Sequence, residues 1–200
     1  MYKTHAPIIS KHAQQSADNL ADVILMVVLS IQQPWHSVGS QMKDVAQHKK
    51  DSRFLWGNKK KTYNYLSKNK GKMFGQFRAI INSSKTDHEK SVSLMKLFMQ
   101  VDGLGAVKAG FVCQLTAGLV GCIDLHNVRM YRIDDKVLKI STKIKSKELY
   151  HKKIEDYVEL CHNIGTEKLW DSWCNHLATQ KNRFNDAMEV SKAHVDYLFV

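Results

Sequence analysis

The nine residues Val101-Asp102-Gly103-Leu104-Gly105-Ala106-Val107-Lys108-Ala109 place two glycines around one leucine, between two apolar segments. Glycines at this spacing allow a tight turn between helices with the backbone open on one side. We expect Leu104 to turn into the core and the free N–H groups of the turn and the next helix to point outward. With the positive end of the helix dipole, these groups form a phosphate site that reads no base sequence. A plain helix–helix turn is the alternative interpretation.

The pattern on both sides of this turn predicts helices along the whole chain, because apolar residues recur mostly at spacings of three and four. Thr86-Asp87-His88-Glu89 has the form of a capping box and predicts a helix that runs to Met99. A helix over 106–117 is predicted to follow the turn and to end at Gly118. A first helix of about twenty residues is predicted from Ser10 to near Pro34. The remaining expected elements are helices over 38–49, 52–66, 73–81, 147–161, 166–178 and 182–198, and a loop or short ribbon over 137–145.

The charge balance points to a polyanionic partner. Thirty Lys and Arg residues against nineteen Asp and Glu give a formal charge of +11, and nucleic acid is the commonest polyanion in a cell. The stretch Lys49–Lys72 contains eight lysines and Arg53, interleaved with aromatic residues. It predicts a surface that follows a nucleic-acid backbone. The alternatives are a basic surface that only maintains solubility and a solvated helix pair in which Trp56 and Tyr63 are buried.

The apolar residues and cysteines exclude several classes of protein. The most apolar run, Val23–Ile31, is nine residues long and too short to cross a membrane. Met1–Gln15 has no apolar segment of the kind that a signal peptide requires. No pair of the four cysteines has the two-residue spacing of a zinc or redox motif. We therefore expect no metal, no cofactor and a cytoplasmic location with reduced thiols.

A second motif follows the hairpin, and together the two resemble the helix-hairpin-helix DNA glycosylase superfamily, which includes endonuclease III and the adenine glycosylases. That family has an apolar-Gly-apolar-Gly-x-x-x-Ala hairpin, a helix ending in glycine, and then Asp-x-His-x-x-Arg. The matching positions are Gly103, Gly105, Ala109, Gly118, Asp124, His126 and Arg129. Leu29-Ser30-Ile31-Gln32-Gln33 is similar to the family's early helix end, which reaches the DNA. Elsewhere the resemblance is only one of helical content.

The resemblance implies a single all-α unit of two lobes: a helical barrel over 20–131, with the hairpin at 96–118, and a second lobe from 1–19 and 132–200. In such proteins a base is extruded from the duplex into a pocket between the lobes. Asp124 would then be the catalytic carboxylate that stabilises positive charge at the sugar. It also suits the cap of a helix that begins at Leu125. The expected DNA contacts are Gly103, Leu104, Gly105, Ala106, Lys108, Gln32, Gln33 and Arg129.

Three departures from the family pattern affect the expected chemistry. Glycosylases that also cut the strand use a hairpin lysine as a nucleophile, but the alignment places Val107 at that position. Lys108 is therefore expected to face elsewhere and to contact phosphate, as in a monofunctional enzyme. Val28 stands where adenine glycosylases have a glutamate. Cys161 and Cys174 are too far apart, and too few, for the iron–sulfur loop of several relatives.

Two other functions remain open. One is a phage-type transferase on the same scaffold that adds groups to modified thymine, which leaves the glycosidic bond intact. The other is a non-catalytic DNA-binding or structural module. In each case the expected partner is DNA, the default state is a monomer, and the expected location is the cytoplasm or nucleoid of a bacterium or a phage-infected cell.

Overall fold

The computed structural model describes residues 1–142, 144–179 and 184–199, and every regular element in these ranges is helical. The α-helices of these ranges are α1 Tyr2–Ala13, α2 Ala17–Leu29, α3 Val38–His48, α4 Gly57–Ile81, α5 Asp87–Met99, α6 Ala106–Thr116, α7 Leu125–Met130, α8 Lys147–Ile164, α9 Thr166–Thr179 and α10 Ala187–Asp196. Short 3-10 helices are η1 Trp35–Ser37, η2 Lys49–Asp51 and η3 Asp135–Leu138. The expected all-α class is confirmed for this part of the chain.

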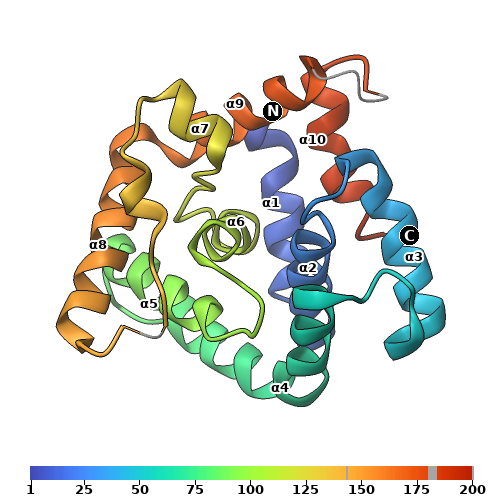
Figure 1. The fold of residues 1–200 in the computed structure, drawn as a ribbon, viewed down its shortest axis with the longest axis horizontal. Helices are drawn as coiled ribbons and strands as arrows, with labels where there is room; N and C mark the ends of the chain where they lie inside the picture. The colour runs from blue at the N-terminus through green and yellow to red at the C-terminus, as the bar shows by residue number, and fades with distance from the viewer. Residues whose placement is uncertain (143, 180–183, 200) are drawn as a thin grey trace.

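Helix α6, which follows the glycine turn, lies in the middle of the molecule (Figure 1). It packs against α1, α2 and α5. Its buried residues include Ala109, Phe111, Val112 and Leu115, which point in different directions around the helix axis. A helix that is apolar on all sides has no face for solvent. The core therefore fixes α6, and with it the turn at its N-terminal end.

The N-terminal region contains two helices, where the sequence predicts one that begins at Ser10. Ser16 starts α2, because its side chain accepts a hydrogen bond from the backbone N–H of Asn19 at 3.1 Å. Helix α1 begins before Ser10 and continues through Pro7, which is exposed. The predicted single helix was wrong because the cap at Ser16 interrupts it.

Helix α4 is one continuous element, although the sequence predicts two helices over 52–66 and 73–81. Gly71 and Gly75 lie inside it and are exposed. Leu66, Met73 and Phe77 are buried at helical spacing, on the side where α4 packs against α2 and α5. Burial of this face outweighs the weak helix propensity of the two glycines.

Other expectations about the elements are confirmed. Thr86 and Glu89 form the predicted capping box at the start of α5. Gly118, with φ of +72°, follows the end of α6. The region 137–145 holds the end of η3 and a loop, without a strand among the residues that the structure describes. The predicted helix over 182–198 corresponds to α10, while 182 and 183 lie outside the described residues.

Both ends of the described chain meet in one region. Helix α1 packs against α9 and α10 as well as against α2 and α6. One hydrophobic core includes residues of all these helices. The expected division into a barrel and a second lobe remains a prediction.

Candidate functional site

The glycine turn between α5 and α6 packs against the first two turns of α4. Gly103 has a φ of +91°, and a Cβ at this position would lie 2.5 Å from the carbonyl oxygen of Asn58. Thr62 donates a hydrogen bond to the carbonyl of Asp102 at 2.6 Å. Glycine is required at 103 both by its backbone conformation and by this close approach. The hairpin is therefore held against α4 as well as against the core.

The start of α6 is open to solvent. Leu104 is turned into the core, as the sequence predicts, and the side chain of Ala106 is also buried. Gly105 precedes α6 without a side-chain cap, and no atom lies within 4 Å of the place where its Cβ would be. The first N–H groups of a helix have no partner within it. These amides, at the positive end of the helix dipole, suit an anion such as a phosphate.

Lys108 points toward the end of α2. It is partly buried, and its ammonium donates a hydrogen bond to Oγ of Ser30 at 3.1 Å. Burial lowers the pKa of Lys108, whereas Cys122 and the carboxylate of Asp124 raise it. The charges of Lys108 and Asp124 therefore interact. The sequence predicts that Lys108 contacts phosphate, and the structure shows its ammonium bonded to Ser30.

Asp124 is held in place from two sides. Its Oδ1 accepts the N–H of Asn127 at 2.9 Å, so it caps α7 as the sequence allows. The hydroxyl of Tyr157 on α8 accepts the N–H of Ile123 at 3.0 Å and donates to the carbonyl of Gly121 at 3.1 Å. These bonds fix the segment that leads to Asp124. The carboxylate is only half-buried and so remains accessible.

A second lysine, Lys59 of α4, extends this site. Its side chain is 1% exposed, and its ammonium donates a hydrogen bond to the carbonyl of Leu29 at 2.9 Å. Burial, together with the nearby charge of Lys108, lowers the pKa of Lys59 to about 8. The same ammonium lies 4.9 Å from the centre of the Trp56 ring. Contacts thus connect Trp56 to Lys59, and both Lys59 and Lys108 to the end of α2.

The remaining predicted residues lie in the turn after α2 and on α7. Gln32 is exposed with a φ of +54°, in the turn directly after α2, and Gln33 is partly exposed. Arg129 is exposed on α7. His126 stacks on His176 at a ring distance of 4.0 Å, and its Nε2 contacts Ser172. His126 therefore connects α7 to α9.

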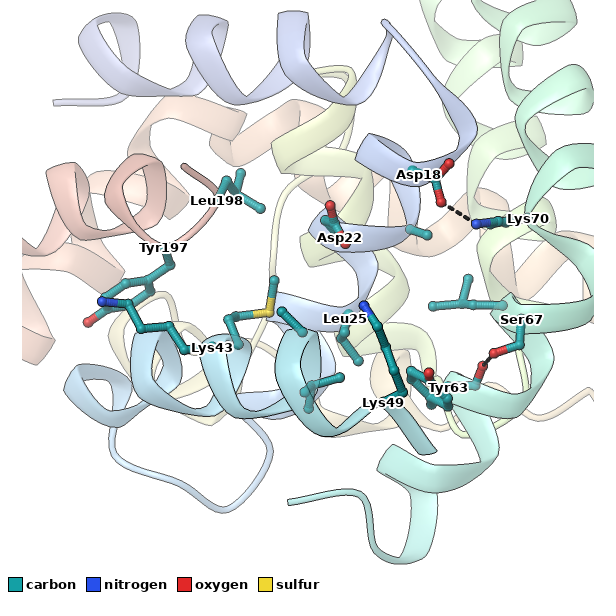
Figure 2. A pocket seen from close by; sticks show the side chains of 15 residues that line it. Asp18, Asp22, Leu25, Lys43, Lys49, Tyr63, Ser67, Lys70, Tyr197 and Leu198 are labelled. Atoms are coloured by element: carbon teal, nitrogen blue, oxygen red, sulfur yellow. Dashed lines mark hydrogen bonds and ion pairs between the residues drawn. The ribbon is translucent and has the colours of Figure 1, made fainter. Parts of the chain in front are cut away.

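A separate cavity of about 520 Å³ lies between α2, α3, α4 and the C-terminal residues, and contains none of the predicted site residues (Figure 2). Asp18 and Lys70 form an ion pair at one side of it. Asp22 and Lys49 point into it from opposite sides (Figure 2). Burial raises the pKa of Asp22, as does the neighbouring carboxylate of Asp18. Sequence reasoning did not single out this group.

Sequence reasoning also missed Lys59 and Tyr157 as parts of the site. Lys59 is one of eight lysines between 49 and 72, and no local pattern separates a buried lysine from its exposed neighbours. Tyr157 has no motif, and only the fold brings α8 to the segment before Asp124. For Trp56 the sequence left open whether the side chain is buried or belongs to a nucleic-acid surface, and the structure leaves it 45% exposed.

Three general features of the described residues bear on the chemistry of the site. All four cysteines are buried and free of disulfides. No group of three or more potential metal ligands is found among 1–142, 144–179 and 184–199. Over the same ranges no helix has the length and apolar character needed to cross a membrane. Comparisons with protein-family models, curated proteins and solved structures find no match.

Proposed function

We propose that this chain is a DNA-binding enzyme that removes a modified or mispaired base extruded from the duplex, with Asp124 as the catalytic carboxylate. The main supporting observation is the neighbourhood of Asp124. It is half-buried, its charge acts on Lys108, and its segment is fixed by Tyr157 and Asn127. A carboxylate held in a rigid and partly desolvated place suits the stabilisation of a developing positive charge.

The reaction is a hydrolysis of the glycosidic bond. As that bond breaks, its electrons leave with the base and positive charge grows on the sugar. Asp124 stabilises this charge and orients a water molecule. The water supplies a hydroxyl to the sugar carbon and a proton to the departing base. Every atom of the reaction comes from the DNA and water, and no cofactor is required.

Binding to the DNA backbone is assigned to the hairpin. The open amides at Gly105 and Ala106 suit one phosphate, and the formal charge of +11 favours the duplex as a whole. Arg129 is exposed and available for a second phosphate. Gln32 and Gln33, in the turn after α2, are proposed to fill the gap left by the extruded base.

The test is to incubate the protein with duplexes that contain damaged, mispaired or hypermodified bases, and to analyse released bases by mass spectrometry. A glycosylase releases a free base. A transferase changes the mass of the DNA and leaves the glycosidic bond intact. A non-catalytic module binds the duplexes and yields neither product.

A further inference from the structure

Trp56 is an exposed aromatic side chain beside the site. It is 45% exposed and immediately precedes α4. Its ring has no contact with another aromatic ring among the described residues; the ring contact that the structure records there is with the ammonium of Lys59. A lone exposed apolar residue needs no explanation by itself. What makes Trp56 informative is its position directly before α4 and its contact with the buried ammonium of Lys59.

Lys59 anchors the ring to the end of α2. Its ammonium lies 4.9 Å from the ring centre and donates to the carbonyl of Leu29 at 2.9 Å. A cation near the face of an indole is attracted by the ring's quadrupole. Lys59 is almost completely buried, so it cannot follow the ring into solvent. Trp56 is therefore positioned by a fixed group, which is itself bonded to the carbonyl of Leu29.

The hairpin lies close to the same part of α4. The carbonyl of Asn58 approaches Gly103 so closely that a Cβ there would lie 2.5 Å from it. Trp56 is two residues before Asn58, in the segment that leads into this part of α4. Lys60 and Lys61, in the next positions of α4, are exposed. An aromatic surface flanked by cations is the arrangement that single-stranded nucleic acid requires.

We propose that Trp56 is a stacking platform for an unpaired nucleobase of the bound DNA. This proposal rests on the proposed function, because it requires that DNA binds at the hairpin. Stacking on an indole is tolerant of base identity, since every base has a π-face. Trp56 would therefore favour DNA with an extruded or unpaired base over fully paired DNA, whatever the base is.

Tryptophan fluorescence tests this proposal, because the molecule's other tryptophans are less exposed: Trp35 and Trp170 are 3% and 1% exposed and Trp173 is partly buried. The probe is a single-stranded oligonucleotide of about 12 nucleotides, long enough to exceed the site of one binding module. Binding is followed separately by the anisotropy of a dye on the DNA. We expect bound DNA to quench the emission of the wild type. Trp56→Phe should still bind but show little quenching, whereas Trp173→Phe, the matched control, should be quenched like the wild type.

Affinity gives a second measure of the same contact. Trp56→Ala should lose about tenfold in affinity for a duplex with one unpaired base, an effect typical of a lost base stack. It should lose less than threefold for the fully paired duplex. Because Trp56 is exposed, neither Trp56→Phe nor Trp56→Ala should change the thermal stability appreciably. Circular dichroism checks this.

The outcomes separate this proposal from the proposed function. Unchanged quenching in Trp56→Phe, or equal losses of affinity for both duplexes in Trp56→Ala, overturns the stacking role while DNA binding stands. Absence of any anisotropy change with the wild-type protein, for the oligonucleotide and for both duplexes, overturns DNA binding, and with it the stacking role.

Discussion

Lys108 on α6 donates a hydrogen bond to Ser30 at the end of α2, although the two residues are 78 positions apart in the chain. Ser30 directly follows Leu29, whose carbonyl accepts the hydrogen bond of Lys59. Lys59 of α4 and Lys108 of α6 thus bond to two consecutive residues at the end of α2. This junction brings the predicted hairpin and the predicted helix end into one site.

The two hairpin glycines should respond differently to the same substitution. Gly103→Ala should destabilise the fold by about 2 kcal/mol or more, because φ there is +91° and the new Cβ would meet Asn58. Gly105→Ala should change stability by less than about 1 kcal/mol, since Gly105 has an ordinary φ of −102° and open space beside it. Thermal denaturation of both variants provides the measurement. Equal losses of stability in the two variants would mean that Gly103 is not confined by its backbone conformation and by Asn58.

If the proposed function holds, DNA binding should weaken steeply with salt, because backbone amides and lysines would contact phosphates. Gly105→Asp should reduce the affinity at least tenfold at moderate salt, since it adds a negative charge at the open end of α6. Fluorescence anisotropy between about 50 and 200 mM salt measures both effects. If Gly105→Asp binds like the wild type, the hairpin is not the DNA anchor.

Lys108→Met distinguishes the role seen in the structure from the expected phosphate contact. Since Lys108 is bonded to Ser30 and its charge interacts with that of Asp124, we predict that turnover at saturating DNA falls about tenfold or more, with little change in affinity. A phosphate contact would give the opposite pattern. Borohydride should trap no covalent adduct with the wild type, because the proposed hydrolysis has no lysine intermediate. An adduct that disappears in Lys108→Met would assign the nucleophile to this lysine.

His194 should make the fold sensitive to acid. It is fully buried among Trp35, Trp170 and other aromatic rings, and burial lowers its pKa from 6.5 to about 3. Below pH 6.5 the unfolded chain therefore binds a proton that the folded chain does not, so stability falls as the pH falls toward 3. The loss is on the order of 1 kcal/mol for each pH unit.

His194→Phe should remove this part of the acid sensitivity. The difference in melting temperature between variant and wild type should shift in favour of the variant as the pH is lowered from 6.5 to 4. Asn64→Gln, a change at an exposed and non-ionisable residue of α4, is the control and should leave the wild-type slope unchanged. Parallel slopes for His194→Phe and wild type would contradict a neutral buried His194.

The parts of the fold that were predictable depend on local chemistry. The hairpin is encoded by two glycines around Leu104, and the start of α5 by Thr86 and Glu89. Turn formation by glycine and helix capping involve only residues a few positions apart, so they can be predicted without knowledge of the tertiary structure. The all-round burial of α6 follows in the same way from its apolar sequence.

The parts that were not predictable depend on contacts between distant segments. The glycines of α4 favour a break locally, but packing of Met73 and Phe77 keeps the helix continuous. Lys59 resembles its exposed neighbours in sequence, and its burial is decided by Leu29, 30 positions away. The inward turn of Lys108 likewise depends on Ser30. Sequence therefore singled out the hairpin, Lys108 and Asp124 as candidates, but not Lys59 or the bond between Lys108 and Ser30.

Base release by Asp124→Asn, compared with wild type on the same duplex panel, tests the central claim most directly. The substitution keeps the shape and the cap of α7 but removes the charge that acts in the transition state. We predict that the wild type releases free base from at least one modified or mispaired duplex. Asp124→Asn should bind that duplex within about threefold of wild type and release no base. Equal release by the two proteins, or binding of every duplex without release by the wild type, would contradict the account.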